Sequence, residues 1–102
     1  KVILFLSLFL SFSVQASESI TGNVLVIRVP LWAEDRACIL VEDKWFKLDL
    51  SSQNGRAAYA IALAAHTSGV KLKAEWQASS NLEGGCDTGT SMHPLYALRT
   101  AG

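Results

Sequence analysis

The spacing of apolar residues predicts a single helix near the middle of the chain. In residues 55–69, GRAAYAIALAAHTSG, the apolar positions follow the i, i+3, i+4, i+7 pattern of one helix face. These positions are Ala58, Ile61, Ala62 and Ala65. Alanine gives the stretch a high helix propensity, and Gly69 suits the left-handed residue that ends a helix. Two interpretations stay open: the helix only covers a small core, or its alanine-rich back also contacts another subunit.

Short runs of alternating or β-branched residues predict five strands around this helix. Two runs alternate strictly between apolar and polar residues, and three are apolar runs bounded by turn residues. The predicted strands are residues 22–30, 37–41, 45–50, 70–76 and 95–99. Residues 17–21 are predicted to be a polar lead-in. Residues 77–94 form a long polar loop, and such a loop in a small domain is usually functional or flexible.

The order of three strands, a helix and two strands resembles the OB-fold, a five-stranded Greek-key barrel. This resemblance implies a β-rich domain with one helix that covers residues 17–102. An open antiparallel sheet with one helix packed across it is the competing architecture. The Gly-x-Ala-x-Tyr pattern of the helix, the two cysteines and the N-terminal segment are also similar to small uncharacterised exported bacterial proteins and, more distantly, to OB-type B subunits of bacterial toxins.

The N-terminal pattern predicts a secretory signal peptide over residues 1–16. A basic residue, Lys1, precedes an apolar run, and small residues stand at the −3 and −1 positions before a cleavage point after Ala16. The run is shorter than the roughly 20 residues of a spanning helix, which disfavours a membrane anchor. We therefore expect a periplasmic or secreted protein that does not stay inserted in a membrane.

Charge and cysteine content narrow the functional classes further. Nine Lys and Arg balance nine Asp and Glu, so no basic field favours nucleic-acid binding. Both cysteines, Cys38 and Cys86, lie in the exported part, and an even count in an oxidising compartment favours one disulfide. Closing a loop of about fifty residues would stabilise the fold by roughly 4 kcal/mol. Two free buried thiols are the alternative.

The OB resemblance implies a place for a ligand. In that fold the loops between strands one and two and between strands four and five border the binding groove. The corresponding segments here are residues 30–37 and 77–94. Cys38 follows the first and Cys86 lies in the second, so a disulfide would tie the two loops together and lower the entropy cost of binding. The alternative is that the bridge only fixes a long loop to the barrel.

Three residues are candidate ligand contacts. Trp32 lies in the first of these loops, Trp45 falls on the outward phase of its strand, and Asp87 follows Cys86. Exposed tryptophans are favoured at protein and sugar contacts because they offer a large area at low entropy cost. Local packing is the alternative for both. Trp76 ends a strand on its apolar phase and is expected in the core.

Catalytic and metal chemistry receive little support. Residues 87–90, Asp-Thr-Gly-Thr, resemble the aspartic-protease signature, but only 13 residues follow Gly89 and no apolar strand precedes it. We interpret Asp87 as a turn residue. The two histidines, His66 and His93, have no spacing that indicates a triad or a metal site. We therefore expect no enzymatic activity, no cofactor and no metal.

The sequence thus leaves three functional hypotheses in order. The first is an exported, non-catalytic module that binds a protein or a glycan through its two tied loops. The second is a subunit that oligomerises through strand edges and the back of the helix, so a homo-oligomer is an open alternative. The third is a small hydrolase, which we disfavour.

Overall fold

The structure is a computed structural model that describes residues 17–33, 35–86 and 91–101. The predicted signal peptide, residues 1–16, lies outside the described residues. The described chain is β-rich with a single helix, as predicted. Its elements, in order, are β1 Ser17–Gly22, β2 Val24–Arg28, β3 Arg36–Val41, β4 Lys44–Asp49, α1 Gln53–Ser68, β5 Leu72–Gln77, β6 Glu83–Gly84, β7 Ser91–Pro94 and β8 Ala97–Thr100.

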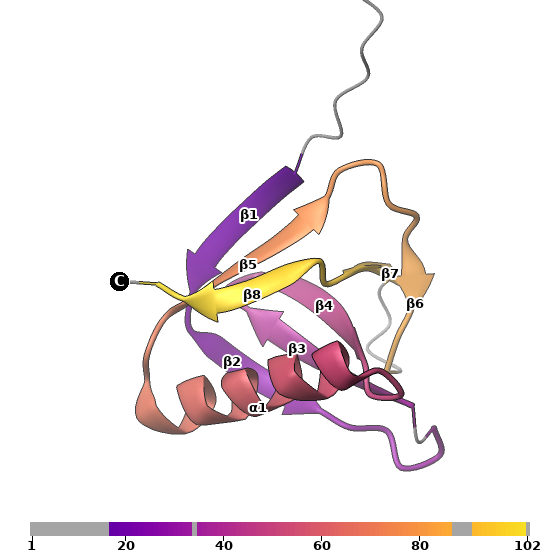
Figure 1. Ribbon diagram of the computed structural model, residues 1–102, viewed down its shortest axis with the longest axis horizontal. Helices are drawn as coiled ribbons and strands as arrows, with labels where there is room; N and C mark the ends of the chain where they lie inside the picture. Colours follow the sequence, from indigo (N-terminus) through magenta and orange to yellow (C-terminus); the bar gives the residue numbers. More distant parts are fainter. Residues whose placement is uncertain (1–16, 34, 87–90, 102) are drawn as a thin grey trace, which may run out of the picture.

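The strands form two sheets that are joined by two bent segments (Figure 1). One sheet has the order β1-β5-β8, and the other has the order β2-β3-β4-β7-β6. Only Asn23 separates β1 from β2, and only Leu95 and Tyr96 separate β7 from β8. At the second bend the Leu95 N–H bonds the Lys47 carbonyl at 3.1 Å, and the Tyr96 N–H bonds the Glu75 carbonyl at 2.8 Å. The last segment is therefore hydrogen-bonded to both sheets.

The first bend is held by one residue of the β3–β4 turn. Glu42 donates its backbone N–H to the Asn23 carbonyl at 3.1 Å, and its carboxylate accepts the Asn23 N–H at 3.0 Å. Glu42 has a positive φ of 58°, which is unfavourable for a residue other than glycine. The two bonds to Asn23 offset that strain and fix the point at which the chain leaves one sheet and enters the other.

The sheet arrangement corrects the predicted architecture. The sequence predicts five strands in one closed barrel, whereas the described residues form eight strands in sheets of three and five. Residues 17–21 are not a lead-in, because β1 pairs with β5 from Ser17 and Gln77 to Gly22 and Leu72. Most of β1 is exposed, so no apolar alternation marks it. Similarly, β6 and β7 lie in the predicted loop 77–94.

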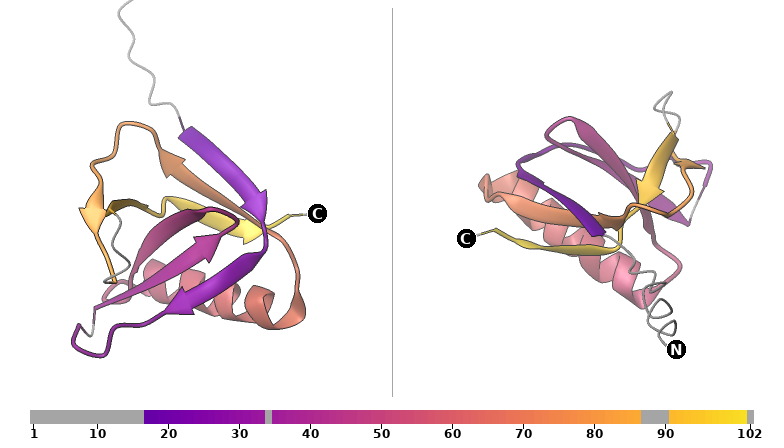
Figure 2. Two further views of the ribbon diagram at one scale, coloured as in Figure 1. Left: turned by 180° about the vertical axis from the view of Figure 1, so that it is seen from behind. Right: turned by 90° about the horizontal axis from the view of Figure 1, so that it is seen from above.

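The core lies between the sheets and the helix. Figures 1 and 2 show α1 on one side of the molecule, alongside β2, β4 and β8. The buried apolar residues come from both sheets and from α1: Val24, Ala37, Ile39, Val41, Phe46, Leu48, Ala62, Ala65, Leu72, Ala74 and Trp76. The ring of Trp76 lies 5.3 Å from that of Phe46, with Lys44 Nζ 4.9 Å from its centre. The prediction that Trp76 belongs to the core is confirmed.

Both ends of α1 follow the sequence signals. The Ser52 hydroxyl accepts the Gly55 N–H at 2.9 Å and caps the first turn. Gly69 adopts a left-handed conformation with φ 79°, and its N–H bonds the Ala65 carbonyl at 2.8 Å. On the predicted inner face Ala62 and Ala65 are buried, whereas Ile61 remains 36% exposed. The exposed Ile61 side chain borders a cleft described below.

Replacing Gly55 by alanine should destabilise the fold. A Cβ at this position would overlap the backbone carbonyl oxygen of Asp49, so the first turn of α1 must move away from β4. We expect Gly55→Ala to lower the free energy of unfolding by about 1–3 kcal/mol. Urea unfolding followed by tryptophan fluorescence measures this change. Gly84→Ala is the matched control, because no atom lies within 4 Å of its Cβ position; equal losses for the two variants would contradict the contact.

Candidate functional site

A disulfide between Cys38 and Cys86 connects β3 to the segment that follows β6. The predicted bridge is therefore confirmed; the two Cα atoms lie 6.0 Å apart and both residues are fully buried. The bridge lies outside the main core, in a separate cluster with Met92 and the half-buried Trp45. A Cβ on Gly85 would lie 2.9 Å from the Cys38 sulfur and 2.7 Å from that of Met92, so glycine allows the close approach.

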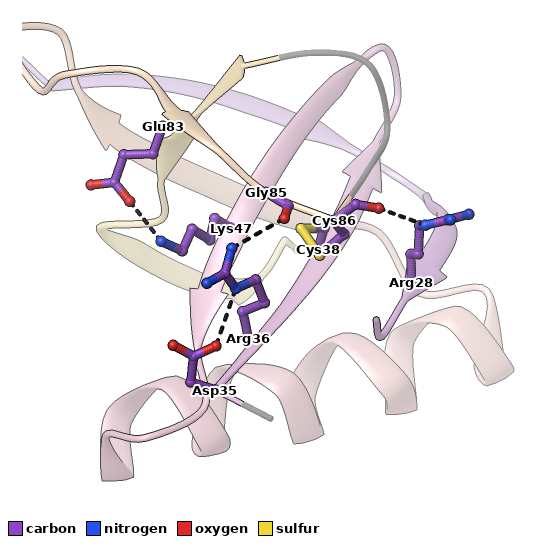
Figure 3. Close-up of a disulfide and its surroundings, with 8 residues drawn as sticks. All are labelled: Arg28, Asp35, Arg36, Cys38, Lys47, Glu83, Gly85 and Cys86. Carbon is purple, nitrogen blue, oxygen red and sulfur yellow. Dashed lines mark hydrogen bonds and ion pairs between the residues drawn. A yellow bond between two sulfur atoms is a disulfide. The ribbon is translucent and has the colours of Figure 1, made fainter. Parts of the chain in front are cut away.

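Two arginines hold the same segment to the sheet (Figure 3). Arg28 of β2 donates from Nε to the Cys86 carbonyl at 2.6 Å, and Arg36 of β3 donates from Nη1 to the Gly85 carbonyl at 3.3 Å. Arg36 also donates from Nε to the Asp35 carboxylate at 3.1 Å. The segment is thus fixed by one covalent bond and by side chains from two neighbouring strands.

The bridge differs in detail from the predicted loop-to-loop connection. Cys38 lies within β3, directly opposite Arg28 of β2 and Lys47 of β4. It therefore fixes the segment that follows β6 to β3, another strand of the same five-stranded sheet. The first loop is connected to this segment by hydrogen bonds instead: Arg36 bonds the Gly85 carbonyl next to the disulfide, and Asp35 bonds Arg36. The Asp35 carbonyl also accepts the Leu50 N–H at 2.9 Å.

The first loop ends in a turn that projects two apolar side chains. Pro30 is buried, and its carbonyl accepts the Ala33 N–H at 3.2 Å. The two residues between them, Leu31 and Trp32, are 91% and 67% exposed. Trp32 is therefore free to contact another molecule, whereas the predicted contact Trp45 packs in part against the disulfide cluster.

An open cleft of about 820 Å³ lies between the first turns of α1, the end of β4 and the bend between β7 and β8. Its polar lining residues are Asp35, Lys47, Asp49, Ser51, Ser52, Asn54 and Glu83. Its apolar and aromatic lining residues include Ala57, Ala58, Ile61, Leu95, Tyr96, Ala97 and Leu98. Asp35 comes from the first predicted border loop and Glu83 from the second, so both segments contribute to one cleft.

Two of the carboxyl groups that line the cleft have lowered pKa values. A hydrogen bond from Arg36 holds the pKa of Asp35 below its ordinary value of 3.8. Hydrogen bonds from the hydroxyl and the backbone N–H of Ser51 likewise hold the pKa of Asp49 below 3.8. Lys47 Nζ lies 2.8 Å from the Glu83 carboxylate, so one of the three acidic side chains is paired within the cleft itself.

The sequence-predicted contacts and the cleft overlap only in part. Neither Trp32 nor Trp45 lines the cleft, and Asp87 lies outside the described residues. Sequence reasoning missed Tyr96, which is 62% exposed at the cleft, because it falls inside a predicted strand. Sequence reasoning placed Asp49 at an outward-facing strand position but did not propose it as a site residue. That outward position was nevertheless the signal that its carboxylate is exposed to solvent.

The histidines take part in structural hydrogen bonds. Ser80 donates its hydroxyl to the Gln77 carbonyl at 2.8 Å and lies 2.6 Å from His93 Nδ1. Since the single hydroxyl proton is given to Gln77, His93 Nδ1 carries the proton of the second bond, and the pair closes the turn after β5. His66 Nδ1 donates to the Val24 carbonyl at 2.8 Å. No group of three metal-ligating side chains occurs among the described residues.

Three findings bear on the compartment and the relatives of this protein. The disulfide fits an extracellular or periplasmic protein. In the part of the chain that the structure describes, no helix is long and apolar enough to cross a bilayer. No protein-family model, curated protein or solved structure matches the chain.

Removing the disulfide should destabilise the fold and loosen one border of the cleft. Because the bridge closes 48 positions of sequence, we expect the double variant Cys38→Ala, Cys86→Ala to lose roughly 4 kcal/mol of unfolding free energy. Chemical denaturation measures the loss, and non-reducing peptide mass spectrometry checks the pairing in the parent. A double variant with the same unfolding free energy as the parent would show that the disulfide does not stabilise the fold.

Proposed function

We propose that the protein is a non-catalytic binding module that takes a glycan in the cleft between α1, β4 and the β7–β8 bend. One observation supports this most: carboxylate, hydroxyl and amide side chains line the same cleft as the exposed ring of Tyr96. Binding sites commonly combine an apolar or aromatic surface with a few polar groups that fix orientation. A sugar offers the matching chemistry, because its hydroxyl groups donate and accept hydrogen bonds and its ring carries an apolar C–H face.

Each side chain has a specific part in this proposal. The Asp49 and Asp35 carboxylates accept hydrogen bonds from sugar hydroxyls, and charge-assisted bonds of this kind are stronger than neutral ones. Asn54 both donates and accepts. Tyr96 supplies the flat surface on which a sugar ring stacks. Trp32, three residues from Asp35 in the same loop, would extend the contact of a longer glycan beyond the cleft. Trp45 of β4 and Asp87 of the second segment remain proposed contacts.

Rigidity supports the assignment. The disulfide and the bonds from Arg28 and Arg36 hold the segment that contains Glu83, and the Asp35 carbonyl is bonded to the start of the connection to α1. The Asp49 carboxylate is itself oriented by Ser51. Groups that are already in place need not be ordered when the ligand arrives, which lowers the cost of binding.

The finer architecture and the export route belong to the same proposal. We propose that the two sheets are halves of an OB-like barrel, since β1–β2 and β7–β8 each run from one sheet into the other. We also propose that residues 1–16 are removed after Ala16 and that the domain acts in the periplasm or outside the cell.

Oligomerisation is the second candidate function, and one observation favours it. Five large apolar side chains are exposed in residues 25–32, on an edge strand and the turn that follows it. A surface of this kind suits a protein contact more than a sugar contact, because most of its side chains are aliphatic.

Glycan binding is tested by array screening followed by calorimetry with the best sugar. We expect Asp49→Asn to weaken binding by at least about tenfold, because a charge-assisted hydrogen bond is lost. Tyr96→Ala should weaken it by about fivefold through loss of stacking. Val70→Ala is the matched control, since Val70 is 43% exposed but does not line the cleft. An array without binders, or equal affinities for all variants, would refute the proposal.

The pH dependence of binding follows from the two lowered pKa values. Because the pKa values of Asp35 and Asp49 are lowered from the ordinary 3.8, protonation that weakens their hydrogen bonds to the sugar occurs at a lower pH than for an ordinary aspartate. We expect affinity to stay constant from about pH 7 to about pH 5 and to fall in stronger acid. Titrations across this range check the result. A loss of affinity centred well above the ordinary carboxyl range would contradict the assignment of these two acceptors.

A further inference from the structure

Exposed apolar side chains are concentrated on one short part of the surface, which we call the β2 patch. Of the ten large apolar residues that are exposed in the described chain, five fall within residues 25–32. The β2 patch consists of Leu25, Val26, Val29, Leu31 and Trp32. Arg28 is the one charged residue of the stretch, and its Nε is already bonded to the Cys86 carbonyl at 2.6 Å. A concentration of five exposed large apolar side chains within eight consecutive residues is the signal of an interaction surface.

The patch lies on a strand that has a neighbour on one side only. β2 is the terminal strand of its sheet and pairs with β3 alone (Figure 1). At the start of β2, His66 of α1 covers the edge by donating to the Val24 carbonyl at 2.8 Å. Beyond that point the strand ends the sheet, and an open strand edge is a template for pairing with another chain.

Hydrogen-bond directions identify which backbone groups point outward. The Glu42 N–H bonds the Asn23 carbonyl, so the Glu42 backbone faces β2. Directions alternate along an antiparallel strand, so Leu40 and Cys38 also face β2. Their partners in β2 are Val26 and Arg28. The backbone N–H and C=O of Ile27, between these two, therefore point away from β3, as does the Val24 carbonyl that His66 bonds.

We infer that this edge is occupied by β2 of a second copy of the chain, antiparallel, about a two-fold axis at Ile27. In this register Ile27 of each copy bonds Ile27 of the other. Leu25 then lies opposite Val29 of the second copy, and Val26 lies opposite Arg28. Leu25 and Val29 thus face each other across the axis, Val26 faces Arg28, and Arg28 does not lie directly opposite its own equivalent.

Charge and local geometry favour a second copy over an unrelated partner. A two-fold contact uses the same surface on both molecules, and a patch with one charge that does not oppose itself meets this requirement. The ladder has natural ends: an irregularity lies between Val24 and Val26 at one end, and Pro30, which has no N–H, lies at the other. The contact would join two five-stranded sheets into one. This inference deepens the second candidate function, oligomerisation, and does not rest on glycan binding in the cleft. Trp32 is the one residue of the patch that is also a proposed glycan contact.

Sedimentation velocity over a concentration series tests the proposal on the disulfide-bonded protein. We expect dimers at about 100 µM, well above the micromolar range of weak interfaces. Leu25→Lys places a charge on the patch and should leave monomers. Leu82→Lys is the matched control, because Leu82 is 58% exposed outside the patch, and it should leave the dimer intact. A monomeric parent, or loss of dimers in Leu82→Lys alone, would overturn the proposal.

Disulfide trapping tests the register even where Leu25→Lys fails to fold. Leu25 of one copy faces Val29 of the other, whereas neither faces its own equivalent. A mixture of Leu25→Cys and Val29→Cys proteins should therefore form cross-linked heterodimers under mild oxidation, and each variant alone should form few. The native sulfurs are fully buried, and Cys38 pairs with Arg28 rather than with either of these positions. Cross-linking of each variant alone, without enrichment in the mixture, would overturn the two-fold axis at Ile27. Glycan binding by a monomeric Leu25→Lys protein separates this result from the proposed function.

Discussion

The covalent bond between Cys38 and Cys86 fixes the segment that follows β6 against β3. Without it, the segment between β5 and β7 would have only a two-residue strand and a few side-chain bonds to hold it. With it, Met92 and Trp45 pack around the sulfurs in a second cluster outside the core. The segment is thereby held in place, and its residue Glu83 lines the cleft.

The two bends are held by different interactions, one by a single side chain with its backbone and the other by backbone hydrogen bonds to both sheets. At Asn23 the bend is held by Glu42, which reaches it through both its backbone and its carboxylate. At Leu95 and Tyr96 it is held by backbone bonds to two different sheets. A domain this small buries little apolar surface, so polar bonds at such points count for more than they would in a large protein.

The extent to which the sequence predicted this structure depends on how local each signal is. Strict alternation located β4 and β5, and the helical spacing of apolar residues together with Gly69 located α1, because those signals lie within a few residues. β1 has no apolar alternation and exists through pairing with β5, more than fifty positions away, so local reasoning missed it. The cleft was missed for the same reason: Asp49 and Tyr96 meet only after folding. The disulfide could be predicted because an even number of cysteines in an exported protein favours a bridge whatever the fold.

Complete burial of the two sulfurs also affects how the protein responds to reductants. A thiolate must reach a sulfur atom directly to exchange with it, and Gly85 and Met92 cover this one. Exchange therefore requires the segment around Cys86 to detach first, which breaks the bonds from Arg28 and Arg36. The rate of reduction is then set by local opening of the fold, and the protein retains its bridge for some time after it enters a reducing environment.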